Sequence, residues 1–223
     1  MELPRFGALD AIIFDLDGTL VDTAPDLGAA LNRLLAEHGR APVPPPDIRR
    51  MIGEGAAKLV ERGFIFTGGL PGALQPLVAR FLEIYEPRVT ETSRPFPGVT
   101  ATLERLAAAG IPLGVCTNKP DQATRHLLDA LALTRYFRAV SGGDVPARKP
   151  DSRHLLGVLR DLDASPSRSL MVGDSPNDVA AARNAGVPVV VVSFGYTQIP
   201  AAQLGADGLI DDFAVLPKIL GMT

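Results

Sequence analysis

The sequence predicts an α/β protein, in which a Rossmann-like core built on a parallel sheet carries an inserted all-helical cap. Short apolar runs alternate along most of the chain with segments whose apolar residues recur at helical spacing. This alternation is typical of a parallel sheet covered by helices. Between residues 23 and 92 it stops, and only helical patterns remain. We therefore expect one core interrupted by one helical insert.

The expected strands are apolar at successive positions, as strands buried on both faces of a sheet are. They cover residues 11–14, 111–116, 139–140, 170–172 and 187–192, and a last strand and helix are expected within 206–213. Leucines at helical spacing lie between the runs, as at Leu155, Leu156 and Leu159. Right-handed crossovers through such helices would make the strands parallel.

The insert sets the expected domain boundaries. Residues 23–92 form the helical cap, and residues 1–22 and 93–223 form the core. The turn signal Pro95-Phe96-Pro97-Gly98 marks the return of the chain to the core.

Helix signals divide the insert further. Its first helix is expected to begin at a T-x-x-D capping box, from Thr23 to Asp26, and to stop at Gly39. The proline-rich run 42–46 predicts an extended connector, after which Asp47 can cap another helix.

Composition and charge exclude several classes of protein. The chain has 223 residues, 46% hydrophobic and 21% charged, and is long enough to bury a core without disulfide or metal staples. Its single cysteine, Cys116, cannot close an internal disulfide, and a formal net charge of −3 gives no basic surface for nucleic acid or anionic membranes. Membrane-span and signal-peptide patterns are absent from the sequence. We therefore expect a cytoplasmic protein, monomeric or homodimeric, that binds neither nucleic acid nor membrane.

Polar side chains follow four of the expected strands, at the edge of a parallel sheet where ligands bind. They are, in chain order, Asp15 and Asp17, Thr117 and Asn118, Lys149, and Asp174 and Asp178. Each segment alone has an ordinary structural interpretation, as a turn, a helix cap, a solvated lysine or a first-turn helix residue. Their joint placement favours one polar site.

The charges of these residues predict that such a site holds a metal ion. The four aspartates and Lys149 together carry a net charge of −3, which would repel a phosphate dianion. A divalent cation relieves this repulsion, and a ligand set of oxygens without histidine or cysteine points to Mg²⁺. A carboxylate nucleophile, a second carboxyl group, a metal ion, a lysine and hydroxyl donors are the parts needed for phosphoryl transfer through an aspartyl-phosphate.

The same segments resemble the four motifs of the haloacid dehalogenase-like phosphohydrolases. They occur in the same order along the chain, with a helical insert after the first. They read Asp15-Leu16-Asp17-Gly18-Thr19, Thr117-Asn118, Lys149-Pro150 and Gly173-Asp174-Ser175-Pro176-Asn177-Asp178. The resemblance implies that Asp15 attacks phosphorus and that Asp17 protonates the departing alkoxide and then deprotonates the hydrolytic water. It also implies that Lys149 neutralises charge on the nucleophile and on the phosphoryl group.

The resemblance implies a ligand set as well. Mg²⁺ would be held by the carboxylate of Asp15, the backbone carbonyl of Asp17 and the side chain of Asp174, with Asp178 assisting from a neighbouring position. Thr117 and Asn118 would bind the phosphoryl oxygens.

Within the superfamily the chain is similar to bacterial phosphoglycolate phosphatases, at residues 20–27, at 52–56 and at Thr117-Asn118-Lys119-Pro120. The implied reaction converts a small phosphorylated metabolite, 2-phosphoglycolate, to glycolate and phosphate. In that family the cap closes over the site, which makes residues 23–92 the expected lid. Gly53, Glu54 and Gly55 are its expected substrate-binding segment, and a simple helix break is the other interpretation of these glycines. Glu54 departs from the Asn or Asp that family members often have there.

Other functions stay open on the sequence alone. Another sugar-phosphate phosphatase or a phosphomutase would use the same aspartates. A dehalogenase is disfavoured, because it needs neither the metal nor an aspartate at position 17. A phosphonate hydrolase would need a Schiff-base lysine in the insert, where Lys58 is the one lysine. A signalling receiver module, a protein of another class, also pairs a phospho-accepting aspartate with Mg²⁺, a hydroxyl residue and a lysine. The second aspartate and the large helical insert count against a receiver.

Overall fold

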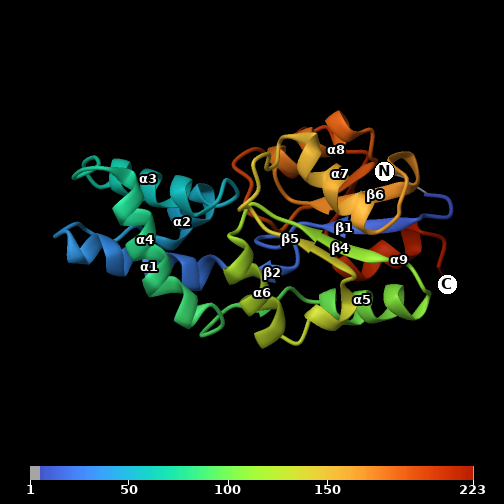
Figure 1. The fold of residues 1–223 in the computed structure, drawn as a ribbon, viewed down its shortest axis with the longest axis horizontal. Coiled ribbons are helices and arrows are strands. Elements are labelled where there is room, and N and C mark those ends of the chain that lie inside the picture. The colour runs from blue at the N-terminus through green and yellow to red at the C-terminus, as the bar shows by residue number, and fades with distance from the viewer. Residues whose placement is uncertain (1–5, 223) are drawn as a thin grey trace.

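A six-stranded parallel sheet forms the centre of the core (Figure 1). The computed structural model describes residues 6–222. Its sheet contains β1 (Ala11–Phe14), β4 (Leu113–Cys116), β5 (Ala139–Ser141), β6 (Ser169–Gly173), β7 (Val189–Val192) and β8 (Gly208–Ile210). These strands lie in the order β5-β4-β1-β6-β7-β8, and every neighbouring pair runs parallel. The predicted α/β core is confirmed, with small shifts at the strand ends.

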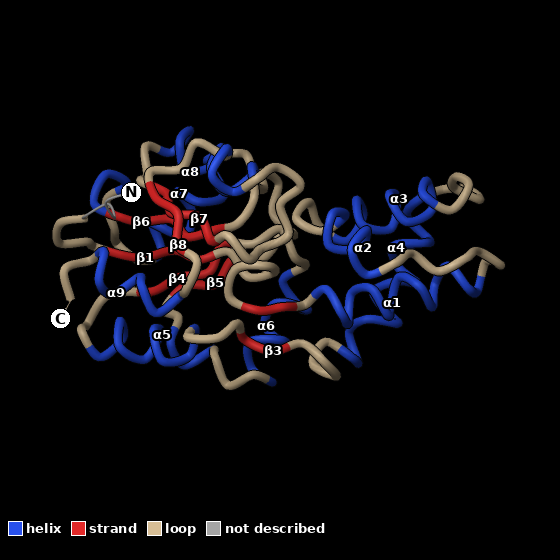
Figure 2. Tube along the Cα trace, turned by 180° about the vertical axis from the view of Figure 1, so that it is seen from behind, coloured by secondary structure: helices blue, strands red, loops and turns tan. Residues whose placement is uncertain are grey.

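Helices cover both faces of this sheet (Figures 1 and 2). One face carries α7 (Ser152–Asp161) and α8 (Pro176–Ala185), and the other carries α5 (Val99–Ala108), α6 (Asp121–Ala130) and α9 (Leu216–Ile219). Ile12 and Phe14 of β1 pack toward α5 and α6, whereas Ala11 and Ile13 pack toward α7 and α8. Because successive strand side chains point to opposite faces, a strand that is apolar at every position needs helices on both sides.

The direction in which strands are added along the sheet reverses at β1. β4 and β5 lie on one side of β1, and β6, β7 and β8 lie on the other. Phe14, the last residue of β1, is in register with Val115 of β4 and with Val172 of β6. The loops that follow these three strands therefore leave the sheet side by side, at the kind of switch point where open parallel sheets bind ligands.

Four helices form a group of their own beside the sheet, at the left of Figure 1. They are α1 (Ala24–Glu37), α2 (Pro45–Met51), α3 (Ala56–Phe66) and α4 (Leu74–Tyr85). Their apolar faces meet around residues such as Leu31, Phe64 and Phe81, all fully buried. We refer to residues 23–92 as the cap.

The chain enters and leaves the cap through a short two-stranded sheet. β2 (Val21–Asp22) pairs antiparallel with β3 (Arg94–Pro95). Short 3₁₀ turns complete the described structure, at Glu86–Arg88, Thr134–Tyr136, Pro166–Arg168, Ala201–Gln203 and Phe213–Val215. None of the helices between residues 6 and 222 combines the length and the hydrophobicity that a membrane crossing requires.

The capping box predicted at the start of α1 is wrong. Thr23 stands at the N-cap position, but its side chain accepts no capping hydrogen bond. Asp26 turns instead to the segment that returns from the cap, where the backbone amides and the hydroxyls of Thr92 and Ser93 all donate to its carboxylate. Burial alone would raise the pKa of Asp26, but these hydrogen bonds outweigh it and hold the pKa below its ordinary value.

The helix cap predicted at Asp47 is also wrong. α2 begins two residues earlier, at Pro45, with Pro44 as its N-cap residue. Proline is well suited to the first helical position because its fixed φ is already helical and its missing N–H would have no partner there. Asp47 therefore lies inside the first turn, where its carboxylate pairs with Arg50.

Candidate functional site

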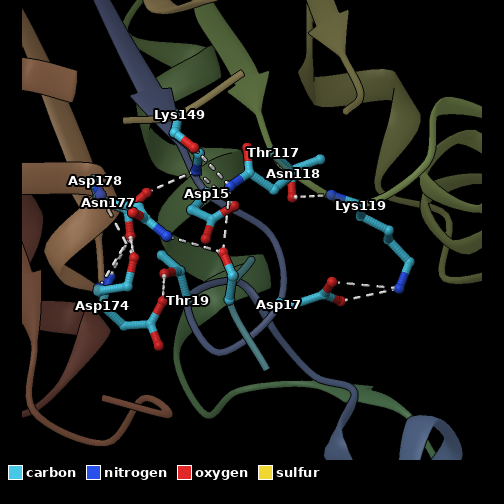
Figure 3. Close-up of polar contacts among 12 residues, drawn as sticks. Asp15, Asp17, Thr19, Thr117, Asn118, Lys119, Lys149, Asp174, Asn177 and Asp178 are labelled. Atoms are coloured by element: carbon cyan, nitrogen blue, oxygen red, sulfur yellow. Dashed lines mark hydrogen bonds and ion pairs between the residues drawn. The ribbon is translucent and has the colours of Figure 1, made fainter. Parts of the chain in front are cut away.

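Three buried carboxylates meet where β1 and β6 end (Figure 3). Asp15, Asp174 and Asp178 each offer an oxygen, and these three atoms lie within 4.8 Å of one another. The residues are 6%, 2% and 0% exposed. Burial, together with the neighbouring carboxylates, raises the pKa of Asp15 to about 6 and the pKa of Asp174 well above its ordinary value. Like charges held this closely need a cation or shared protons.

Lys149 places a positive charge inside this cluster. Its Nζ lies 2.9 Å from Asp15 Oδ1 and 2.6 Å from Asp178 Oδ1. Burial would lower the pKa of Lys149, but the two carboxylates outweigh it and raise the pKa, so the side chain stays protonated. Three carboxylates and one ammonium group leave a net charge of −2. A divalent cation would balance this charge.

Hydrogen bonds fix two of the three carboxylates, Asp178 at the start of α8 and Asp174 just before it. Ser175 caps the helix and forms a capping box with Asp178, whose Oδ2 accepts hydrogen bonds from the backbone amides of Asp174 and Ser175 and from the Ser175 hydroxyl. Asp174 accepts one hydrogen bond on each oxygen, from Thr19 Oγ1 at 3.0 Å and from the Tyr196 amide at 2.7 Å. Asp178 is thus both a first-turn helix residue and a member of the cluster.

The donor set of the cluster suits a hard cation. All of its candidate ligands are carboxylate oxygens, and those of Asp174 keep lone pairs after accepting one hydrogen bond each. The loop after β1 passes close by at Gly18, which has φ of +87°, and a Cβ there would lie 2.5 Å from Asp174 Oδ2. The buried aspartates can therefore bind a metal ion, with the backbone of residues 17–19 against them.

Thr117 and Asn118 lie beside Asp15, as predicted, at the end of β4. Both residues and Asp15 line one cavity between the core and the cap. Thr117 is 2% exposed and Asn118 is 5% exposed. The Asn118 amide donates to the carbonyl of Lys149 at 3.0 Å, which ties the loops after β4 and β5 together. These side chains can present polar groups to an anion bound at Asp15.

Asp17 lines the same cavity, but its carboxylate does not join the other three. It turns toward Lys119, whose Nζ lies 3.1 and 3.4 Å from the two carboxylate oxygens (Figure 3). Lys119 Nζ also donates to the Tyr85 hydroxyl of α4 at 2.6 Å. The sequence motifs assign no role to Lys119. The available signal was its position, as one of four lysines in the chain and directly after Thr117 and Asn118.

The glycines of the cap segment meet the core, whereas Glu54 does not enter the cavity. Gly53 accepts hydrogen bonds on its carbonyl from the side-chain amides of Asn118 and Asn177, at 3.3 and 3.4 Å. At Gly55, where φ is +86°, a Cβ would lie 2.9 Å from the Asn118 carbonyl. The Glu54 carboxylate pairs with Arg62 and lines a neighbouring hollow. The segment is therefore both a break between α2 and α3 and a cap–core contact.

Tyr196 is a second residue of the site that no sequence motif indicates. Its backbone amide holds Asp174, and its hydroxyl donates to Asp22 Oδ1 at 2.5 Å. The same hydroxyl accepts hydrogen bonds from the backbone amides of Thr23 and Ala24, at 2.7 and 3.0 Å. One tyrosine thus connects the aspartate cluster to the point where the chain enters the cap.

Cys116 is not part of the reactive set. It lies at the end of β4, fully buried, and burial raises the pKa of its thiol to about 12. A thiol that stays protonated is a poor nucleophile, which agrees with the sequence interpretation of Cys116 as a strand residue.

Known proteins resemble the chain over nearly its whole length. A family model described as haloacid dehalogenase-like hydrolase matches residues 12–192. A phosphoglycolate phosphatase of Caulobacter vibrioides is 51% identical over 210 residues, which cover 93% of this chain and 89% of the relative.

Two solved structures show the same likeness. The crystal structure of a predicted phosphoglycolate phosphatase from Haemophilus somnus has a TM-score of 0.90 and 34% identity, covering 95% of this chain and 97% of that one. The structure of CbbY from Rhodobacter sphaeroides in complex with xylulose-(1,5)bisphosphate has a TM-score of 0.79 and 27% identity, covering 92% and 95%.

Proposed function

Because the chain belongs to the haloacid dehalogenase-like hydrolase family, we propose that it is a Mg²⁺-dependent phosphomonoesterase that converts 2-phosphoglycolate to glycolate and phosphate. The observation that carries this proposal is the position of Asp15, which directly follows the inner strand β1, contacts Lys149 and lines a cavity between the core and the cap. A relative with half of its residues identical bears the name of this activity, which supports the choice of substrate.

Asp15 would be the nucleophile. Its carboxylate oxygen forms a bond to phosphorus while the bond from phosphorus to the ester oxygen of the substrate breaks, which leaves an aspartyl-phosphate and an alkoxide. Lys149, 2.9 Å from Asp15, would offset negative charge on the nucleophile and on the phosphoryl group. Thr117 and Asn118, beside Asp15 in the cavity, would bind the phosphoryl oxygens.

Asp17 would transfer the protons. It gives a proton to the departing alkoxide and later takes one from the water that attacks the phosphorus of the aspartyl-phosphate, which releases phosphate and restores the Asp15 carboxylate. Since its carboxylate faces Lys119, Asp17 would have to rotate away from this lysine to reach the ester oxygen.

The aspartate cluster would hold Mg²⁺. The carboxylates of Asp15 and Asp174 and the carbonyl of Asp17 would be ligands, with Asp178 beside them and already bound to Lys149. Bound Mg²⁺ would neutralise charge between the nucleophile and the phosphoryl oxygens and lower the pKa of Asp15.

The cap, residues 23–92, would be the lid of this site, with residues 1–22 and 93–223 as the core. Its hinge would be the paired segments β2 and β3, where the chain enters and leaves the cap. Gly53 and Gly55, which touch the loop after β4 and the first turn of α8, would close the cavity and exclude stray water from the aspartyl-phosphate. Glu54 would reach the substrate only after leaving Arg62.

The substrate would be a small phosphorylated metabolite of the cytoplasm, a reducing compartment in which a lone cysteine such as Cys116 persists as a free thiol. A second candidate substrate class is the sugar bisphosphates, because the CbbY structure, which is similar along most of the chain, holds xylulose-(1,5)bisphosphate.

Phosphate release from a panel of substrates tests the proposal. Purified wild-type protein, Asp15→Asn and Asp161→Asn are incubated with 2-phosphoglycolate, xylulose-1,5-bisphosphate or glucose 1-phosphate, in Mg²⁺ or in EDTA. Asp161 is an exposed aspartate, the last residue of α7, and is not among the residues that line the cavity, so it serves as the matched control. We expect release from 2-phosphoglycolate that requires Mg²⁺, is lost in Asp15→Asn and is retained in Asp161→Asn. No release by the wild type, or equal release by Asp15→Asn, would overturn the proposal.

A further inference from the structure

The cavity that Asp15 lines contains one cationic side chain. Most of the cap residues that line it are apolar, among them Leu27, Ile52, Leu59 and Phe81. Among the described residues that line this cavity, Lys119 carries the one positive charge. Its side chain is 2% exposed, so water does little to screen that charge.

The charge of Lys119 is balanced by Asp17, the residue that must turn away from it in the proposed reaction. Its ammonium group is paired with the Asp17 carboxylate at 3.1 Å. When Asp17 turns to the ester oxygen, as the proposed function requires, this contact is broken. A buried ammonium group without a counter-ion is strongly unfavourable. A substrate that brings an anion to this point restores the balance, whereas a neutral leaving group leaves Lys119 unpaired.

We propose that Lys119, together with the hydroxyl of Tyr85, binds the carboxylate of the leaving group, so that the site selects phosphomonoesters in which the carbon that bears the ester oxygen also bears a carboxylate. This inference rests on the proposed function and names its specificity determinant. In such an ester the carboxylate and the ester oxygen are attached to the same carbon. Because Lys119 already contacts Asp17, an ester oxygen that Asp17 protonates brings that carboxylate toward Lys119.

Tyr85 fits the second position of this carboxylate site. Its hydroxyl accepts a hydrogen bond from Lys119 Nζ at 2.6 Å, so its own proton is available to a ligand oxygen. Burial raises the pKa of Tyr85 to about 12, which keeps that proton in place. Tyr85 ends α4 of the cap and Lys119 follows β4 of the core. A carboxylate held by both would also favour the closed arrangement of cap and core.

A comparison of two substrates in two variants tests the inference. 2-Phosphoglycolate is paired with 2-hydroxyethyl phosphate, which keeps the two-carbon chain and replaces the carboxylate by a neutral hydroxymethyl group. For wild-type protein we expect kcat/KM to favour 2-phosphoglycolate by about 10- to 100-fold, the range of one or two charge-assisted hydrogen bonds. In Lys119→Met this preference should fall to within about threefold of unity, with KM for 2-phosphoglycolate rising most. Lys58→Met, which removes an exposed cap lysine, should retain the wild-type preference.

The failure of this inference is distinct from failure of the proposed function. Equal use of both substrates by the wild type would overturn the carboxylate site while phosphatase activity stands. An equal loss of kcat/KM on both substrates in Lys119→Met would also overturn it, and would leave Lys119 as a residue that positions Asp17. Absence of phosphate release from either substrate would count against the proposed function itself. If Lys119→Met does not fold, Tyr85→Phe carries the test, and it must lower the preference by about 3- to 10-fold. An unchanged preference in folded Tyr85→Phe would also overturn the inference.

Discussion

Replacing Lys149 by methionine removes the ammonium group that lies between Asp15 and Asp178. The Lys149 side chain is 2% exposed, and its Nζ is 2.9 and 2.6 Å from the two carboxylates. Methionine nearly retains the shape of the stem, so the substitution changes charge more than packing. The cluster of Asp15, Asp174 and Asp178 is then left with a net charge of −3 in place of −2.

The structure gives the expected size of this effect. Removing one partner of a buried ion pair costs about 3–5 kcal/mol, because the remaining charge stays buried and unpaired. Uptake of a proton by the crowded carboxylates relieves part of this cost, so we expect a loss of about 3 kcal/mol in the free energy of unfolding at pH 8. Lys58→Met is the matched control, since it removes an exposed pair with Glu61 and should cost less than about 0.5 kcal/mol.

Urea denaturation in EDTA measures the loss in the free energy of unfolding, and denaturation in Mg²⁺ measures how much the cation stabilises each protein. A cation that binds the folded state stabilises it by mass action, and the more negative cluster of Lys149→Met should bind Mg²⁺ more tightly. We therefore expect added Mg²⁺ to stabilise the variant more than the wild type. The reasoning is refuted if Lys149→Met in EDTA lies within about 1 kcal/mol of the wild type, or if Mg²⁺ stabilises the wild type more than the variant.

Three further substitutions test other parts of the account. Asp26→Asn should lower the free energy of unfolding by about 2 kcal/mol near pH 7, because it weakens hydrogen bonds to a charged acceptor. The pKa of Asp26 is lowered in the folded state, so the difference from wild type in chemical denaturation should hold from pH 8 to 5 and shrink as the pH falls below about 4. Gly18→Ala should destabilise the protein by about 1–3 kcal/mol and abolish Mg²⁺-induced stabilisation in thermal melts, because its Cβ meets Asp174 and φ is +87°; a melt that Mg²⁺ still shifts would contradict this. Burial, aided by Lys149, lowers the pKa of His154 to about 4, so the neutral form is favoured in the folded state and this side chain should contribute a loss of about 1–2 kcal/mol between pH 7 and 5, measured as the difference between wild type and His154→Gln and after allowance for solvent screening. His154→Gln should lack this loss, and an equal pH dependence in both proteins would show that His154 does not titrate as described.

The core could be predicted because its signals are local or follow from parallel topology. A run such as residues 11–14 is apolar at every position, and the structure buries it on both faces. Once the strands are parallel, the residues after their carboxyl ends must gather at one edge of the sheet. Asp15, Lys149, Asp174 and Asp178 meet there although up to 163 residues separate them, as their numbers show.

The contacts between cap and core could not be predicted in this way. Lys119 meets Asp17 across 102 residues and Tyr85 across 34, and both contacts depend on how the cap packs against the loops. Asp26 fits a local capping pattern, but partners 66 and 67 residues later offer its carboxylate more hydrogen bonds than the helix end does. Local patterns do not show which distant donors a folded chain brings near.

The most direct test of the central claim is the capture of a phosphoryl group on Asp15. Wild-type protein is mixed with 2-phosphoglycolate and Mg²⁺, quenched in acid within the first turnover, digested and examined by mass spectrometry, with Asp15→Asn treated in parallel. We expect one phosphoryl group on the peptide that contains Asp15, sensitive to hydroxylamine as an acyl-phosphate is and absent from Asp15→Asn. Rapid phosphate release with no phosphoryl group on that peptide, or with the group on another residue, would contradict it.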